Sequence, residues 1–191
     1  MIGSGLPIAS AAVAGALLLS ACGGSSSKSS TTKHAAESPA SAACNRAAKA
    51  AMASFLAIQA HQISTSEATG TSGNPECTYT EGIGRHRVKL VADYYTGPQP
   101  YFVLERTAIE ASQVFVPTRT VPPPQAVTMG LEADWFPARE QLMATDGLRL
   151  VTTTVTWNGI TQKRRLALAK AFTKPYIKVT AAGRAAVKGY P

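Results

Sequence analysis

The chain is poor in charged and aromatic side chains, and its acidic residues end early. Of the 191 residues only 16% are charged and 7% are aromatic, and no acidic residue follows Asp146. A low charged fraction with many small residues argues against a disordered polyelectrolyte and against a bulk nucleic-acid binder. No run of 18 or more apolar residues follows the first 25 residues, which excludes a protein with several membrane-spanning helices. The length suggests one domain with an appendage.

The lack of late acidic residues divides the charge unevenly. Residues 1–146 contain ten basic and eleven acidic side chains, for a net charge of −1. Residues 147–191 contain nine basic side chains and no acidic one, for a net charge of +9. The formal net charge of +8 therefore comes entirely from the last 45 residues.

The short motifs of common enzyme classes are also missing. There is no Gly-x-Ser-x-Gly, Ser-x-x-Lys, His-Glu-x-x-His, P-loop or complete dinucleotide-binding pattern. Gly82-Ile83-Gly84 is interpreted as a hairpin turn, and His61 and His86 have no evident partner that would orient a catalytic base. The basic stretch 85–89 is interpreted as a charged edge strand, with an anion-binding strand as the alternative. We predict no enzyme activity, no catalytic residue, no metal site and no cofactor.

Three acids and two tryptophans leave alternatives open. Glu132, Asp134 and Glu140 would suit glycoside or metal chemistry if they converged, but solvated loop acids are the commoner outcome. Trp135 and Trp157 would suit a ligand platform, although one core aromatic and one sheet-face aromatic is the commoner arrangement.

The first 22 residues resemble the signal of a bacterial lipoprotein. Residues 8–19 form an apolar run of the length of a signal-peptide core. The next motif, Leu19-Ser20-Ala21-Cys22-Gly23, is similar to a lipobox. This resemblance implies that residues 1–21 are removed and that Cys22 carries the lipid; an uncut anchor helix is the alternative. We expect an exported protein on the outer face of the cell membrane, held by acyl chains that each contribute about 0.8 kcal/mol per buried CH₂.

The remaining cysteines fit an exported protein. Residues 22–43 are rich in Ser, Thr and Ala and predict a lipidated flexible tether. Beyond the tether, Cys44 and Cys77 form an even pair, which favours a structural disulfide in an oxidising compartment. Such a bond closes a loop of about 33 residues and is worth roughly 3–4 kcal/mol. The alternatives are a metal site and a catalytic thiol, but no Cys-x-x-Cys and no histidine at ligand spacing supports them.

Hydrophobic periodicity predicts an α+β fold in a single globular domain over residues 44–178, followed by a loose basic tail over 179–191. The expected elements are a helix over 44–60, a loop over 64–76, strands over 77–80 and 87–94, a helix over 101–113, a proline-rich loop around 117–124, strands over 141–145 and 148–157 joined by a turn at Asp146-Gly147, and a helix over 159–173. This order suggests an antiparallel sheet of about four strands with helices packed on one face. The expected core-facing positions of the first helix are Ala47, Ala51, Phe55 and Ile58. Asn158 is the expected N-cap of the last helix.

Five short segments carry a family resemblance. They are Cys44, Cys77-Thr78-Tyr79, residues 130–136, residues 146–150 and Leu166-Ala167-Leu168-Ala169. Over roughly residues 44–177 this pattern resembles the actinobacterial lipoprotein domains of unknown function, family 3558 of that class, and related lipid-anchored, sensor-like domains. The resemblance implies a fold and a location and little about mechanism.

Basic side chains on the last predicted helix are the candidate contact for a partner. The candidate anion-contacting residues are Lys163, Arg164, Arg165, Lys170 and Lys174. Anionic lipid or cell-wall polymer would be attracted by about 1 kcal/mol per basic residue near a charged surface. The alternative is an ordinary solvated helix face, whose cations favour the helix C-terminus.

Together these patterns predict an exported, lipid-anchored envelope lipoprotein with a non-catalytic, sensor-like domain that binds a ligand or partner. A hydrolase with an unconventional site and a structural or assembly accessory protein of the envelope are the alternatives. The expected partners are the membrane, through the lipid, and an anionic lipid, wall polymer or envelope protein; no nucleic-acid partner is expected.

Overall fold

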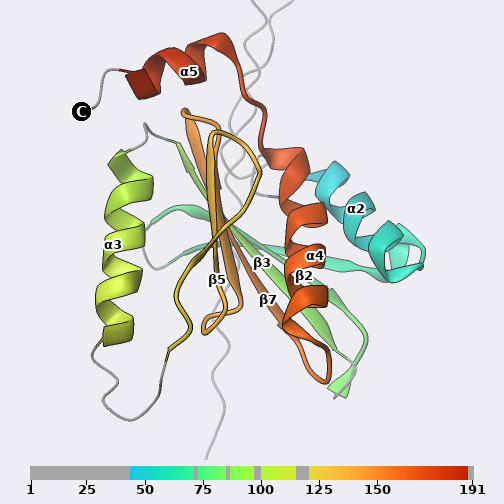
Figure 1. The fold of residues 1–191 in the computed structure, drawn as a ribbon. Helices are drawn as coiled ribbons and strands as arrows, with labels where there is room; N and C mark the ends of the chain where they lie inside the picture. Colours follow the sequence, from blue (N-terminus) through green and yellow to red (C-terminus); the bar gives the residue numbers. More distant parts are fainter. Residues whose placement is uncertain (1–43, 71–72, 85–86, 97–99, 115–120, 189–191) are drawn as a thin grey trace, which may run out of the picture. The chain divides into compact units, whose positions relative to one another are not determined.

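An antiparallel sheet of seven strands organises the fold, in the order β1-β2-β3-β7-β6-β5-β4 (Figure 1). The computed structural model describes residues 44–70, 73–84, 87–96, 100–114 and 121–188, so the predicted signal peptide, the tether with Cys22, and His86 lie outside the described residues. The strands are β1 (Ser64–Thr69), β2 (Pro75–Glu81), β3 (Val88–Thr96), β4 (Gln125–Ala126), β5 (Glu132–Phe136), β6 (Gln141–Thr145) and β7 (Arg149–Trp157). The helices are α2 (Arg46–Leu56), α3 (Pro100–Val114), α4 (Gln162–Thr173) and α5 (Ala181–Lys188), with short 3-10 turns η1 (Ala60–Gln62) and η3 (Lys174–Tyr176).

The α+β class is confirmed, but the expected number of strands is wrong. Strand β1 occupies about half of the segment predicted as a loop, residues 64–76. It could not be recognised in the sequence because its six residues are all exposed and show no hydrophobic alternation. It pairs with β2 in a register that places Ser66 opposite Thr78. Strands β4 and β5 were not expected either, and they extend the sheet at its other edge.

The expectation of helices on one face is also wrong. Helices α2 and α4 cover one face of the sheet, and α3 lies on the other (Figure 1). The buried Phe102 and Ile109 of α3 pack with Phe136, Met143 and Leu150. The sequence of β6 agrees with cover on both faces, because the consecutive residues 142–144 are all buried. A strand with only one covered face would alternate buried and exposed residues.

The core-facing side of helix α2 is only partly the one expected. Phe55 and Ile58 are partly buried and pack against the core, as predicted. Ala47 is exposed, and the fully buried residues are Ala48, Met52 and Ala53. The side chain of Asn45 caps the helix by accepting hydrogen bonds from the backbone N–H groups of Ala47 and Ala48, at 2.8 and 3.2 Å. The helix closes at Ala57, which has a left-handed φ of 56°. The cap therefore fixes where the helix begins, and the small alanine side chains leave its buried face poorly specified by the sequence.

Helix α4 begins later than predicted. Thr161, and not Asn158, is its N-cap, and the Thr161 side chain accepts from the backbone N–H of Arg164 at 3.3 Å. Gly159 lies in the preceding turn with φ of 77°, a left-handed conformation that ends any helix starting at Asn158. Leu168 and Phe172 are buried toward the sheet, as expected.

Part of the expected loose tail is an ordered helix. In α5, Gly183 is buried against the β6–β7 turn, where a Cβ on Gly183 would lie 2.1 Å from the carbonyl oxygen of Asp146. The Asp146 carboxylate is itself buried and accepts from the backbone N–H groups of Leu148, Arg149 and Lys178. Two glycines, Gly147 and Gly183, thus allow the turn and the helix to meet backbone to backbone.

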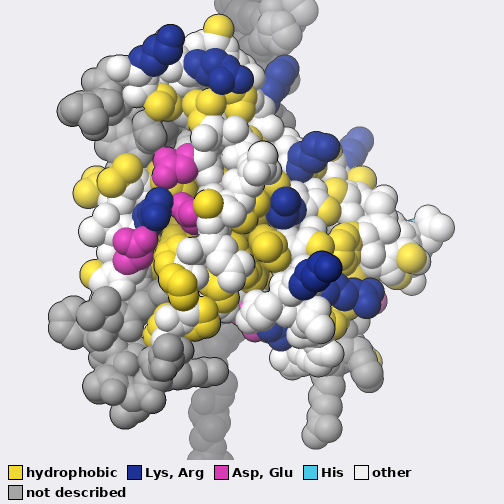
Figure 2. Space-filling model, viewed as in Figure 1, with side chains coloured by type: hydrophobic (Ala, Val, Ile, Leu, Met, Phe, Trp, Pro, Cys, Tyr) yellow, Lys and Arg dark blue, Asp and Glu magenta, His cyan; other side chains and the backbone are white. Residues whose placement is uncertain are grey.

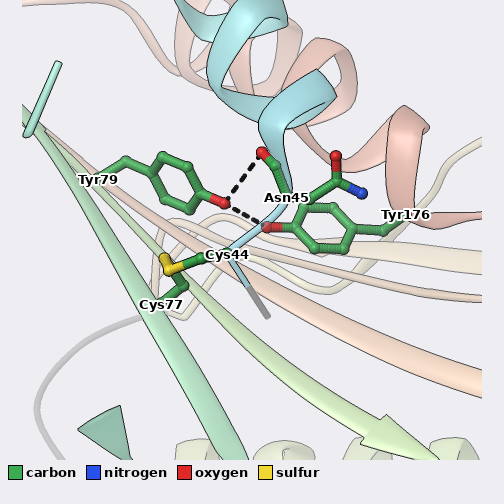
Figure 3. The surroundings of a disulfide bond; sticks show 5 residues. All are labelled: Cys44, Asn45, Cys77, Tyr79 and Tyr176. Carbon is green, nitrogen blue, oxygen red and sulfur yellow. Dashed lines mark hydrogen bonds between the residues drawn. A yellow bond between two sulfur atoms is a disulfide. The ribbon is translucent and has the colours of Figure 1, made fainter. Parts of the chain in front are cut away.

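The predicted disulfide is confirmed: Cys44 and Cys77 are bonded, with their Cα atoms 5.1 Å apart (Figure 3). Beside it the Tyr79 hydroxyl lies 2.8 Å from the Tyr176 hydroxyl and 3.3 Å from the carbonyl oxygen of Asn45. Because a carbonyl only accepts, Tyr79 donates to Asn45 and Tyr176 donates to Tyr79. This cluster connects the start of α2, strand β2 and the η3 turn that follows α4.

All described residues belong to one compact unit. Among these residues, no helix combines the length and the apolar character that crossing a membrane requires.

Candidate ligand-binding cavity

A cavity of about 440 Å³ opens on the domain where the loop between β4 and β5 faces the end of α4. Its lining residues are Thr128, Met129, Gly130, Lys170, Ala171, Lys174, Ile177 and Val179. The volume lies within the range of small-molecule sites. Most of the lining is apolar, and its only charged members are the two lysines.

The loop wall of the cavity is fixed by the sheet. The backbone N–H of Val127 donates to the carbonyl of Ala133 at 2.8 Å, and Leu131 donates to Thr145 at the same distance. Between these bonds, Gly130 has φ of 63°, and a Cβ there would lie 2.3 Å from the carbonyl oxygen of Thr145. Only glycine therefore lets the chain pass at this point. The wall is held close to Ile177 as a result.

The opposite wall is fixed by buried hydroxyl groups. Thr173, the last residue of α4, shares a hydrogen bond of 2.8 Å with Thr153 of β7. Tyr176, in the next turn, is held by Tyr79 as described above. Burial and the hydrogen bond to Tyr79 raise the pKa of Tyr176, so its hydroxyl stays neutral and keeps this contact. Lys174 and Ile177 are therefore presented from a fixed backbone.

Among the residues that the structure describes, the two cavity lysines have no acidic partner. Lys170 and Lys174 are four residues apart on and just after α4, so their side chains lie on the same helix face. Neither forms an ion pair with any described residue. Hydrophobic side chains gather on this face of the molecule between β5 and α4, with Lys and Arg side chains along α4 and over α5 (Figure 2). The cavity thus combines an apolar wall with two lysine ammonium groups that form no ion pair with a described residue.

The structure divides the five predicted anion-contacting residues. Lys170 and Lys174 meet at the cavity, whereas Lys163 is exposed at the beginning of α4. The guanidinium of Arg164 lies over the Trp157 ring, 5.0 Å from its centroid. Arg165 pairs with Glu140 at 2.5 Å and donates two hydrogen bonds to the carbonyl of Trp157. Arg165 therefore already has an anionic partner within the domain.

The three predicted acids do not form one carboxylate site. Asp134 and Glu132 lie on β5, where Arg106 of α3 approaches their carboxylates to 3.1 and 3.5 Å. Glu140 lies with Arg165 instead. The expectation of solvated loop acids is wrong for Asp134, which is a buried strand residue.

The aromatic and histidine candidates take structural positions. Trp135 is buried in the core and Trp157 is half-buried at the end of β7, as expected of one core and one sheet-face aromatic. His61 lies exposed in η1. In the described part of the chain, no group of three or more potential metal ligands comes together.

Comparison with known proteins identifies no relative: no family model, no curated protein and no solved structure matches the chain. The resemblance to family 3558 therefore stays a prediction.

Proposed function

We propose that this protein is an exported, lipid-anchored envelope lipoprotein whose α+β domain binds a ligand without transforming it. The observation that supports binding is the cavity, where Lys170 and Lys174 stand at the edge of an apolar wall. A concave, mostly apolar site with a few polar groups is the usual form of a ligand pocket. A lysine ammonium group that forms no ion pair with an acidic side chain of the described residues is available to bind an anion.

The proposed location rests on residues at the start of the chain. The apolar run and the Leu19–Gly23 motif support export and lipidation at Cys22. The Cys44–Cys77 disulfide agrees with this location, because disulfides persist mainly in oxidising compartments.

Filling the cavity tests the binding function. Ala171 lines the cavity, whereas Ala167 is exposed on the same helix. We expect Ala171→Phe to reduce binding of compounds from an envelope extract at least tenfold, measured as thermal stabilisation and as ligands retained in native mass spectrometry. The matched Ala167→Phe variant should bind as the parent does. Equal binding by all three proteins, or binding by none, would contradict the proposed ligand site.

Removing the lipid attachment point tests the location. A Cys22→Ala variant cannot receive the acyl chains, so we expect labelled fatty acid to be incorporated into the parent and not into the variant. Fractionation should find the parent with the membrane. Residence of the parent in the membrane without incorporated label would indicate an uncut anchor helix instead.

An accessory role in assembly is the second candidate, and one observation favours it. Val103 and Leu104 on α3 are 51% and 67% exposed, respectively. Adjacent exposed apolar side chains are common at protein contacts. Recovery of one stoichiometric membrane partner that is lost in a Val103→Ser, Leu104→Ser variant would support this role.

A further inference from the structure

We infer that the cavity takes a single-chain amphiphile with an anionic head group, a carboxylate or a phosphate. The inference rests on the proposed function and specifies the chemical class of its ligand. It combines three features of the cavity: its charge, its apolar wall and its size.

The charge at the cavity selects the head group. Lys170 and Lys174 are the only charged residues in the lining. Side chains four residues apart on a helix have Cβ atoms about 5–6 Å apart, so both ammonium groups can reach one oxyanion. Acids of neighbouring segments are already engaged: Glu140 pairs with Arg165, Glu132 and Asp134 pair with Arg106, and the Asp146 carboxylate accepts from the backbone N–H groups of Leu148, Arg149 and Lys178. The cavity therefore attracts a negative group from outside the domain.

The apolar wall selects a hydrocarbon next to that head group. Met129 and Ile177 are partly buried and pack against the main hydrophobic core. Val179 and Ala171 continue the same surface toward the solvent. A thioether such as that of Met129 adapts its shape to a flexible chain. A small inorganic anion would leave this apolar surface in contact with water.

The size of the cavity suits a small amphiphile. A volume of about 440 Å³ lies within the range of small-molecule sites. Dodecanoate and decyl phosphate each join one anionic head group to one hydrocarbon chain and therefore serve as probes. A bilayer phospholipid carries two long chains, and we expect it to insert one of them.

A cell-wall polymer is the competing occupant of the same region. A polyanion would contact several exposed basic side chains at once, such as Lys163, Arg184 and Lys188. It would not require the apolar wall. The two occupants therefore respond differently when the cavity is filled or when surface charges are removed.

Calorimetric titration of the full-length Cys22→Ala protein, which carries no lipid of its own, tests the inference. The probes, below their micelle concentrations, are dodecanoate, decyl phosphate, the neutral alcohol dodecanol, and the head groups alone as acetate and inorganic phosphate. We expect dodecanoate and decyl phosphate to bind at least tenfold more tightly than dodecanol, and the head groups alone not to bind measurably. The variant Lys170→Gln, Lys174→Gln should remove this preference for the anions.

Two further variants serve as controls. Lys163→Gln, Lys188→Gln removes the same charge away from the cavity and should change affinity less than twofold. Ala171→Phe should abolish binding of both anionic probes. Vesicles of phosphatidylglycerol, compared with phosphatidylcholine, show whether the same cavity accepts a lipid from a bilayer; cavity insertion predicts that Ala171→Phe also weakens vesicle binding.

Three results would overturn the inference. Dodecanol binding as tightly as dodecanoate would show that the lysines do not select the head group. Inorganic phosphate binding as tightly as decyl phosphate would show that the wall does not hold a chain. Failure of both anionic amphiphiles to bind would exclude the ligand class. If compounds from an envelope extract still bind in an Ala171-dependent manner, the proposed function stands and only this inference fails.

Discussion

Asp93 of β3 is half-buried opposite Glu76 of β2, and this position governs its protonation. Burial, together with the negative charges of Glu76 and of Glu105 on α3, raises the pKa of Asp93 to about 6. A pKa raised above its unfolded value means that the folded state holds the proton more tightly. The contribution of Asp93 to stability is therefore fully present below about pH 4 and is lost as the pH rises through about 6.

We predict that Asp93→Asn stabilises the protein at pH 7.5 and has little effect at pH 4. After a discount for partial solvent exposure, the gain is about 1–2 kcal/mol. Urea unfolding of parent and variant at several pH values between 4 and 8 measures the difference. Glu81→Gln, near the end of the same strand pair, controls for the general loss of one negative charge. A gain of equal size at both pH values would contradict the assignment to Asp93.

The hydroxyl pair of Tyr79 and Tyr176 gives a second prediction. Tyr176→Phe removes the buried hydrogen bond between the two hydroxyl groups but leaves Tyr79 bonded to Asn45, so we expect a loss of at least about 1 kcal/mol in the free energy of unfolding. Tyr79→Phe removes both bonds and should cost more. The double variant should cost less than the sum, because the two residues share one bond. Strictly additive losses in denaturant unfolding would show that the pair is not coupled.

Helix α5 depends on one close backbone contact. A methyl group on Gly183 would overlap the carbonyl of Asp146, so Gly183→Ala should release α5 while the sheet stays folded. We expect amide hydrogen exchange to increase over residues 181–188, with little change over β7. Ala185→Gly, at an exposed position in α5, lowers helix propensity by about 1 kcal/mol without touching the contact. If this control releases the helix equally, the contact is not what holds it.

Elements with a clear hydrophobic period were predictable from the sequence. Strand β3 alternates buried and half-buried residues through Tyr94, and α3 matches its expected span within a residue. Strand β1 gave no such indication, because an exposed edge strand has no buried side. Residues 132–136 contain two acids, yet Asp134 is buried since Arg106 from α3 pairs with it. That pairing depends on a contact between distant segments, which no local pattern contains.

Of the candidate site, the sequence predicted the two lysines but not the apolar wall beside them. The distribution of acidic and basic residues singled out Lys170 and Lys174, but it did not separate them from Arg164 and Arg165. The separation arises because Arg165 reaches Glu140 across the fold. The apolar wall was missed for a similar reason: Gly130 and Ile177 are 47 positions apart and meet only in the folded chain.

For the whole molecule, the disulfide should supply a large share of the stability. The bond joins residues 33 positions apart, and removing such a crosslink costs roughly 3–4 kcal/mol. We predict a loss of that size for Cys44→Ala, Cys77→Ala, seen as a lower urea midpoint. The parent unfolded in the presence of a reducing agent should approach the midpoint of the variant. A reducing agent should leave the variant unchanged; if it does not, the loss has another source.

The position of the Cys44–Cys77 disulfide also determines how the domain would respond to mechanical force. A pull on the chain from before residue 44 reaches the domain at Cys44 and passes directly through the sulfur atoms to Cys77, in a strand with neighbours on both sides. Helix α2, η1 and β1 lie between the two cysteines and are bypassed. In the oxidised protein, tension applied between the chain before residue 44 and the rest of the domain therefore acts on the sheet without first unwinding α2. After reduction the same pull would unwind α2 from its capped end.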